Sequence, residues 1–279
     1  MSRYRSKRRR AISGEFAKKW LTGAISLITL IAAGLGVYVW ASASPPVARD
    51  RATLCPVQGP TEINIVLIDT SDEVPSPARK EALTILTDIA ESLPDNADLD
   101  IRVLDPKYLS GRVLLNLCNP GDGRGLSEFN ANPQLARKRW REKFREPLDR
   151  ALGDGFQTQK TDASPILTTL QAIALERFTG ARAEQLRKRL IVVSDFLEHS
   201  PPAYSHYSGD FRYERFKQTE MYKKVRTDLH GAGVELYYVQ RKGKRSLDSG
   251  AHIKFWIDWI QDNNGHFLKA VKLQGLGTS

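Results

Sequence analysis

Hydrophobic and polar positions divide the chain into one long apolar stretch and a body of shorter alternating segments. No charged residue occurs from Trp20 to Ala48. As a helix, Leu21 to Trp40 would be roughly 30 Å long, which is the thickness of a bilayer core. We therefore predict a transmembrane helix over residues 20–41.

Aromatic residues at both ends of this stretch support the prediction. Trp20 lies at one end and Tyr38 and Trp40 at the other, where the two membrane interfaces would be. Two alternatives remain open. The stretch could be a core helix, or a signal peptide cleaved at the "ASA" of residues 41–43, although the apolar part of a signal peptide is shorter, at about 7–15 residues.

The body alternates between strand and helix patterns, in the order β-α-β-β-α-α-β-α-β-α-β. Continuous apolar runs mark buried strands, and apolar residues at helical spacing mark amphipathic helices. The expected strands are 62–69, 99–105, 112–118, 188–195, 234–240 and 266–273. The expected helices are 76–93, 132–152, 162–178, 213–233 and 250–265.

This order predicts an α/β fold with three layers, a Rossmann-like, mostly parallel sheet with helices on both faces. The connection "PKYLSG" at 106–111 is too short for a parallel crossover, so it predicts an antiparallel hairpin and one antiparallel edge strand. The expected organisation is a basic tail (1–19), the transmembrane helix (20–41), a linker (42–61), one domain (62–273) and a C-terminal tail (274–279).

Charge is concentrated in the N-terminal tail. The chain has 42 basic and 32 acidic residues, a net charge of +10, of which residues 1–19 carry +7. The body is close to neutral, so nucleic acid is not an expected partner. Basic residues before the apolar stretch place the N-terminus in the cytoplasm. We therefore expect a single-pass protein of a bacterial inner membrane with its soluble domain in the periplasm.

Two buried strands end in oxygen-bearing side chains. The first ends at Asp69, followed by Ser71 and Glu73, and the fourth ends at Asp195. Ligands bind beyond the carboxyl ends of strands in such sheets. Ser164, expected at the N-cap of the helix over 162–178, points to the same edge. Such oxygen donors suit Mg²⁺, with Mn²⁺ or Ca²⁺ as alternatives.

These residues resemble the metal-ion-dependent adhesion site of the von Willebrand factor A domain, an Asp-x-Ser-x-Ser loop, a threonine and an aspartate in that order. The resemblance covers residues 62–273. It implies metal ligands at Asp69, Ser71, Ser164, in place of the threonine, and Asp195. It also implies a protein partner that places an acidic residue on the vacant coordination position of the metal.

Two residues depart from the family pattern. Glu73 stands where the family has serine, and Phe196 stands where it often has glycine. Glu73 could ligate the metal or block the position that the partner's acidic residue takes. The alternative is a structural subunit with a degenerate site, in which Asp69 and Asp195 only cap strand ends.

An enzyme is not expected. Ser71 occupies the position where a haloacid-dehalogenase phosphatase needs its second aspartate, and "DTSDE" is not the nucleophile elbow of an α/β-hydrolase. A metal-dependent hydrolase that uses the same oxygen cluster is the less favoured alternative. The tyrosine-rich loop "EHSPPAYSHYSGDFRY", which includes His199 and His206, is a candidate contact surface or a self-packed loop.

The topology brings the two cysteines together. Cys55 precedes the first strand, and Cys118 ends the second strand of the hairpin, so both lie at the end of the sheet opposite Asp69. A disulfide is expected there, in an oxidising compartment; two free thiols are the alternative. The linker enters at this base, so the metal edge should face away from the bilayer.

The helix expected over 132–152 is basic and amphipathic. Its arginines are expected to face solvent, and contact with an acidic partner or with lipid head groups is the alternative.

Overall fold

The computed structural model describes residues 3–42, 47–124, 132–158, 161–240 and 249–273, so the predicted tail at 274–279 lies outside the described residues. The chain separates into an N-terminal unit and a body that begins at Ala48. Helix α1 (Arg3–Ser42) continues the apolar stretch into the basic tail. Within it, Lys18–Tyr38 is long and apolar enough to cross a membrane, with a mean hydropathy of 1.9.

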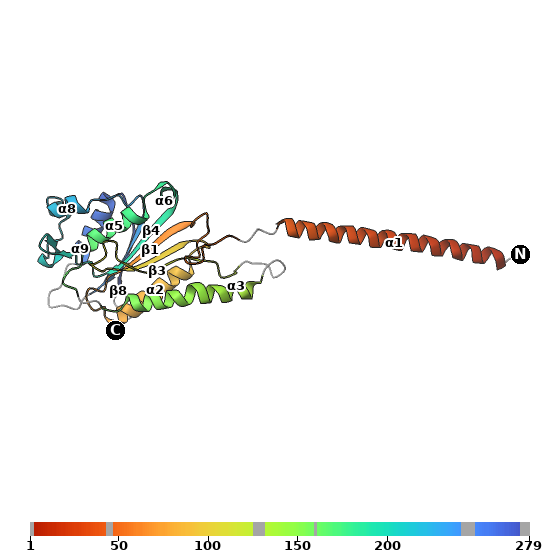
Figure 1. The fold of residues 1–279 in the computed structure, drawn as a ribbon, viewed down its shortest axis with the longest axis horizontal. Coiled ribbons are helices and arrows are strands. Elements are labelled where there is room, and N and C mark those ends of the chain that lie inside the picture. The colour runs from red at the N-terminus through yellow and green to blue at the C-terminus, as the bar shows by residue number, and fades with distance from the viewer. Residues whose placement is uncertain (1–2, 43–46, 125–131, 159–160, 241–248, 274–279) are drawn as a thin grey trace. The chain divides into compact units, whose positions relative to one another are not determined.

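A six-stranded sheet forms the centre of the body, in the order β3-β2-β1-β4-β7-β8. Figure 1 labels β1, β3, β4 and β8 of this sheet. All neighbouring strands in this sheet are parallel except β2 and β3, so β3 is the antiparallel edge that the short connection predicts. The strands are β1 (Glu62–Ile68), β2 (Asp98–Val103), β3 (Arg112–Cys118), β4 (Arg187–Ser194), β7 (Gly233–Val239) and β8 (His266–Leu273).

Helices cover both faces of the sheet, which confirms the predicted three-layer α/β fold (Figure 1). One face is covered by α2 (Ser76–Glu91) and by a continuous helix of three parts: α3 (Pro133–Trp140), the π-helical turn η1 (Arg141–Arg145) and α4 (Glu146–Gly155). The other face is covered by α5 (Ile166–Arg177), α7 (Tyr213–Phe216), α8 (Glu220–Val225) and α9 (Ser249–Asp262), with α6 (Ala181–Gln185) beside them.

Side chains on β1 alternate between the two cores. Ile65 and Leu67 pack towards α5 and α9, whereas Val66 and Ile68 pack towards α2 and α4. All four are at most 2% exposed. This alternation explains why a continuous apolar run forms a central strand: successive side chains point to opposite faces, and both faces are covered.

One predicted helix is wrong in its extent. Residues 213–233 do not form a single helix; the two short helices α7 and α8 are followed by residues 226–229 without helical structure. Thr219 starts α8 because its hydroxyl accepts a hydrogen bond of 3.2 Å from the Tyr222 amide. The break lets Phe216 of α7 pack against both Tyr222 of α8 and Phe255 of α9.

The polar positions of β2 are buried and hold α5 in place. Arg102 is 2% exposed and forms ion pairs of 2.7 Å with Asp100 on β2 and with Glu176 on α5. Asp98 pairs with Arg177, also on α5. Burial raises the pKa of Asp98 to about 6, against the opposing effect of Arg177. These ion pairs orient α5 along the sheet and so position the start of α5 near the ends of β1 and β4.

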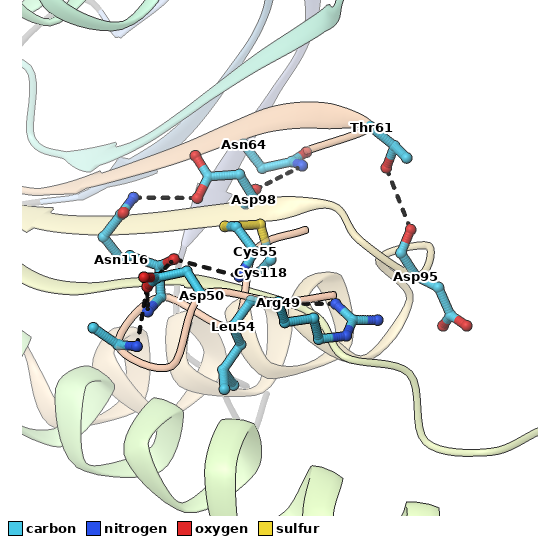
Figure 2. Close-up of a disulfide and its surroundings, with 12 residues drawn as sticks. Arg49, Asp50, Leu54, Cys55, Thr61, Asn64, Asp95, Asp98, Asn116 and Cys118 are labelled. Atoms are coloured by element: carbon cyan, nitrogen blue, oxygen red, sulfur yellow. Dashed lines mark hydrogen bonds between the residues drawn. A yellow bond between two sulfur atoms is a disulfide. The ribbon is translucent and has the colours of Figure 1, made fainter. Parts of the chain in front are cut away.

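The predicted disulfide between Cys55 and Cys118 is present (Figure 2). Cys118 ends β3 opposite the first residue of β2, so the bridge lies at the base of the sheet. Residues 48–61, predicted as part of the linker, pack onto the body here: the Thr53 carbonyl accepts a hydrogen bond of 2.8 Å from the Cys118 amide. The chain therefore enters the domain at the end opposite the carboxyl ends of β1 and β4.

Candidate functional site

The carboxyl ends of β1 and β4 lie side by side at the point where the strand order reverses. β2 lies on one side of β1 and β4 on the other, in parallel register with Ile68 opposite Val193. The next residue, Asp69, donates its amide to the Val193 carbonyl at 2.8 Å. Asp195 follows the end of β4 by one residue. We call this edge of the sheet the rim; in open α/β sheets it is the usual place for a ligand.

Asp69 is the centre of the hydrogen bonds at the rim. Its Oδ2 accepts bonds from the hydroxyls of Ser194 at 2.7 Å and Ser164 at 3.2 Å. Its Oδ1 accepts a bond of 3.0 Å from the Ser71 amide. With a side chain only 5% exposed, Asp69 joins β1, β4 and the segment before α5 at a single carboxylate.

Four of the five predicted metal ligands line one shallow pocket. Asp69, Ser71, Glu73 and Asp195 surround it together with Asp72, Val74 and Val239. Ser71 and Asp195 are each 7% exposed, whereas Glu73 is exposed at the mouth. Within the described residues, the Ser71 hydroxyl makes no hydrogen bond. That hydroxyl and the Glu73 carboxylate are therefore available to a ligand in the pocket.

The fifth residue, Ser164, is at the rim but is not the N-cap of α5, which corrects that prediction. Its hydroxyl binds Asp69, and its backbone forms an isolated β-bridge with His199. The residue before α5 is Pro165, which makes no side-chain cap. Ser164 is thus drawn out of the helix by pairing with the chain that follows β4.

Glu198 takes over the capping role and was not predicted. Its Oε2 accepts a hydrogen bond of 2.8 Å from the Leu167 amide in the first turn of α5, and its Oε1 accepts one of 2.5 Å from the Ser200 hydroxyl. Burial raises the pKa of Glu198 to about 7, and the charge of nearby Asp69 adds to the rise. Sequence pattern gave no signal for Glu198, because its partner lies 31 positions away.

Phe196 keeps the backbone conformation that glycine would adopt. Its φ is 62°, in the left-handed region that non-glycine residues adopt at a cost. The Ser194 hydroxyl accepts a 2.7 Å hydrogen bond from its amide, and the ring stacks on Tyr238 at 5.8 Å between centroids. This packing offsets the cost of the left-handed backbone, so the chain turns tightly after Asp195 although Phe196 is not a glycine. The Oδ1 of Asp195 accepts a hydrogen bond of 3.0 Å from the Leu197 amide in this turn.

Two histidines anchor the loop that follows. The loop contains two short strands, β5 (His199–Ser200) and β6 (Tyr204–Ser205), and His206 directly follows β6. His206 is fully buried, and its Nδ1 lies 3.0 Å from Nε2 of His252 on α9. Burial lowers the pKa of His206 to about 3 and that of His252 to about 4. His206 is thus a packing residue, while Pro201 to Ala203 and Tyr207 of the same loop are exposed.

The donor chemistry of the rim fits a hard divalent cation. Carboxylate and hydroxyl oxygens come from Asp69, Ser71, Glu73 and Asp195, and such oxygens suit Mg²⁺, Mn²⁺ or Ca²⁺. Among the described residues, three ligand atoms of acids, histidines or cysteines come within 4.8 Å of one another only at Cys55, Asp98 and Cys118. Both of those cysteines are in the disulfide, so their sulfurs are not available as thiolate ligands.

The order of the six strands, with β3 as the antiparallel edge of the sheet, establishes the architecture. The body has a von Willebrand factor A-like fold. No family model matches the chain, and no curated protein matches it. A search of solved structures finds similar chains at 10–14% sequence identity.

Three solved structures are similar to this chain at low sequence identity. An aerotolerance-related membrane protein from Bacteroides fragilis NCTC 9343 is 10% identical, with a TM-score of 0.35, covering 75% of this chain and 90% of that chain. The conserved hypothetical protein BatB from Bacteroides thetaiotaomicron is 14% identical, with a TM-score of 0.32 and coverage of 76% and 91%. The manganese-loaded TRAP protein of Plasmodium vivax is 13% identical, with a TM-score of 0.32 and coverage of 70% and 62%.

Within the described residues, the chain combines one helix long and apolar enough to cross a membrane with one von Willebrand factor A-like domain. The domain itself carries the rim at one end of its sheet and its attachment to the preceding chain at the other.

Proposed function

We propose that this chain is a membrane-anchored binding module that recognises another protein through its rim, and that it is not an enzyme. The observation that carries the proposal is the convergence of Asp69, Ser71, Ser164 and Asp195 at the switch point between β1 and β4. The exposed part of the loop after Asp195 adds tyrosine and proline side chains beside this point, and tyrosine is a residue favoured in interfaces.

A divalent cation at the rim would give the module its specificity. Ser71 and Asp195, with Glu73 at the mouth, would hold the cation, and Asp69 would hold the serines in place and balance the positive charge. Mg²⁺ is the expected ion, because it uses few carboxylates and keeps other positions for water or for a partner. A carboxylate of the partner would complete the coordination.

The proposed setting is the periplasm of a bacterial cell. Basic residues before the apolar stretch favour a cytoplasmic N-terminus and an outer location for the domain, and a disulfide persists in such a compartment. The chain enters the domain at its base, which leaves the rim accessible. The protein would act as an adaptor or assembly factor of an envelope complex.

A structural subunit with a degenerate site is the second candidate, and one observation favours it. Both oxygens of Asp69 already accept hydrogen bonds, and Asp195 accepts one from the backbone of Leu197. Carboxylates bound in this way stabilise strand ends without a cation. In this case the rim would contact its partner without a metal.

Titration of the full chain in detergent with Mg²⁺ and Mn²⁺ separates the two candidates. We expect saturable binding to the wild type by calorimetry and none to Asp69→Ala, with Asp88→Ala, an exposed acid on α2, as the matched control. Ser71→Ala keeps Asp69 in place and should weaken binding even if Asp69→Ala misfolds. If the wild type binds neither ion, the cation is ruled out and the structural subunit is supported.

Partner recognition needs a separate measurement. Photo-cross-linking from Tyr207, which is 52% exposed in the loop beside the rim, should capture a protein from membranes. The same yield of cross-linked product after chelation of divalent cations would contradict a cation-dependent interface. A cross-link that forms equally well from the exposed Glu146 on the opposite layer would contradict the rim as the contact surface.

A further inference from the structure

The helix that begins with α3 extends past the base of the sheet. Trp140, at the end of α3, donates its indole N–H to the Asn119 side chain at 3.0 Å, and Asn119 directly follows Cys118 at the base. The other end of the same helix is near the rim, where the Thr70 hydroxyl binds the Gln157 carbonyl at 3.2 Å. The residues before Trp140 therefore extend beyond the base, from about 1.5 Å at Arg139 to roughly 10 Å at Pro133, at 1.5 Å per residue.

This projecting part is basic, and Pro133 and Ala136 on one side of it lie against Gly123 of the body. No residue of α3 is buried. Among the cations of α3, and within the described residues, only Lys138 has a carboxylate within 4.0 Å, that of Glu142 at 3.9 Å. Glu142 is also the only acidic residue in the segment Pro133–Arg145. The exposed cations of α3 and η1 are Arg137, Lys138, Arg139, Arg141 and Lys143.

The chain that leads to α1 leaves the body at this same end. Arg49 donates to the Pro120 carbonyl at 3.2 Å and to the Leu54 carbonyl at 2.9 Å, which fixes it at the base (Figure 2). Between Ser42, the last residue of α1, and Arg49, a fully extended chain spans at most roughly 24 Å. If α1 crosses a bilayer, covalent connection alone keeps the base within that distance of the helix end.

We infer that α3 and the start of η1 form a docking surface for the anionic phospholipid head groups of the bilayer that α1 crosses. Exposed cations on a short tether are attracted to such a surface, with an effect of about fivefold in binding for each charge near it. The inference depends on α1 spanning a bilayer and is independent of the rim and its cation.

An acidic protein is a poorer fit to the same cations. A protein interface needs a core of buried apolar or aromatic side chains inside its polar edge. On α3, Leu135 is the one exposed large apolar side chain, at 42%, and the Trp140 indole is already bound to Asn119. Lipid phosphates need only charge within reach, which α3 supplies.

The test uses the full chain in lipid nanodiscs, with a fluorescent donor on Gln134→Cys in α3 and acceptor-labelled lipids. We expect energy transfer to rise when phosphatidylglycerol replaces part of the phosphatidylcholine, and to fall again in high salt. Arg137→Gln/Lys138→Gln/Arg139→Gln should weaken docking by about a hundredfold, at fivefold per charge. The matched control Lys223→Gln/Lys224→Gln/Lys254→Gln removes three exposed cations from α8 and α9 and should behave as the wild type.

Three results would overturn the inference. The first is energy transfer that does not depend on phosphatidylglycerol, and the second is a triple α3 variant that behaves as the wild type. The third is a change in donor fluorescence on addition of polyglutamate to phosphatidylcholine nanodiscs, with no change on addition of phosphatidylglycerol. That result would assign the surface to an acidic protein. Co-purification of the chain with nanodiscs reports separately on insertion of α1.

Discussion

The hydroxyl of Ser194, the last residue of β4, donates a hydrogen bond of 2.7 Å to Oδ2 of Asp69, the first residue after β1. The same hydroxyl accepts a bond from the Phe196 amide at 2.7 Å. A side chain with no exposed surface thus joins the two central strands and fixes the turn that carries Asp195. The geometry of the rim therefore depends on Ser194, which is outside the predicted metal set, as well as on Asp69.

Ser194→Ala should lower the free energy of unfolding by about 2 kcal/mol, because a buried carboxylate and a buried amide each lose a partner. Ser164→Ala removes only the longer bond of 3.2 Å and should cost about half as much, at roughly 1 kcal/mol. Urea denaturation of the two variants in detergent measures both values. Equal effects would contradict the leading role assigned to Ser194.

Glu73→Gln should weaken binding of Mg²⁺ or Mn²⁺ by about tenfold, since affinity for these ions rises with the number of carboxylates around them. Glu73 lines the pocket with Asp69 and Asp195 and is exposed at its mouth. Glu146→Gln, an exposed acid on α4, is the control. Unchanged or tighter binding by Glu73→Gln would show that Glu73 blocks the site instead of serving it.

Glu198 should make the domain less stable as the pH rises. Burial raises its pKa from the ordinary 4.5 to about 7, so the folded state holds this proton more tightly than the unfolded state. The contribution of this proton to the free energy of unfolding is complete below pH 4.5 and is lost as the pH rises through 7. The total change is about 3 kcal/mol. Glu198→Gln should remove that slope from urea midpoints measured across this range; an unchanged slope would contradict the buried acid.

The buried histidines should act in the opposite direction. Burial lowers the pKa of His206 to about 3 and of His252 to about 4, so the unfolded state binds more protons than the folded state below pH 6.5. Stability should fall by about 3 kcal/mol per histidine as the pH drops from 6.5 to 4. This pH range overlaps the range in which Glu198 titrates. The stability of Glu198→Gln is therefore compared with that of the double variant Glu198→Gln/His206→Asn across the range. A slope that His206→Asn leaves unchanged would disprove the assignment.

Loss of the disulfide should destabilise the body without disturbing the rim. The bridge closes a loop of 63 positions, for which chain entropy gives about 4 kcal/mol. Cys55→Ser/Cys118→Ser should show this loss in urea denaturation, with cation binding unchanged because the rim is at the other end of the sheet. Weakened cation binding in the folded double variant would show that base and rim are coupled.

The periodic parts of the fold could be predicted from sequence, and contacts between distant segments could not. The strand over 266–273 matches β8, and the apolar runs before Asp69 and Asp195 match the central strands. Their position at the switch point follows from strand order, so the predicted rim residues do meet. Glu198 and His206 instead depend on partners 31 and 46 positions away, for which local periodicity contains no information.

Ser164 shows the same principle in reverse. A serine before a proline at the start of a helix predicts an N-cap, because local hydrogen bonds alone favour it. In the folded domain the serine has two stronger partners, the Asp69 carboxylate and the backbone of His199. Tertiary contacts therefore override a sound local preference, and they do so where the site is built.

The bridge between Cys55 and Cys118 also determines how the domain bears mechanical load. A pull along the polypeptide from its N-terminal side meets a branch at Cys55, from which one path continues to β1 and the other crosses to the end of β3. Tension is thereby shared between two strands, and β1, which ends at Asp69, is not peeled from the sheet alone. A force transmitted through the chain should therefore have to disrupt both strands before the sheet comes apart.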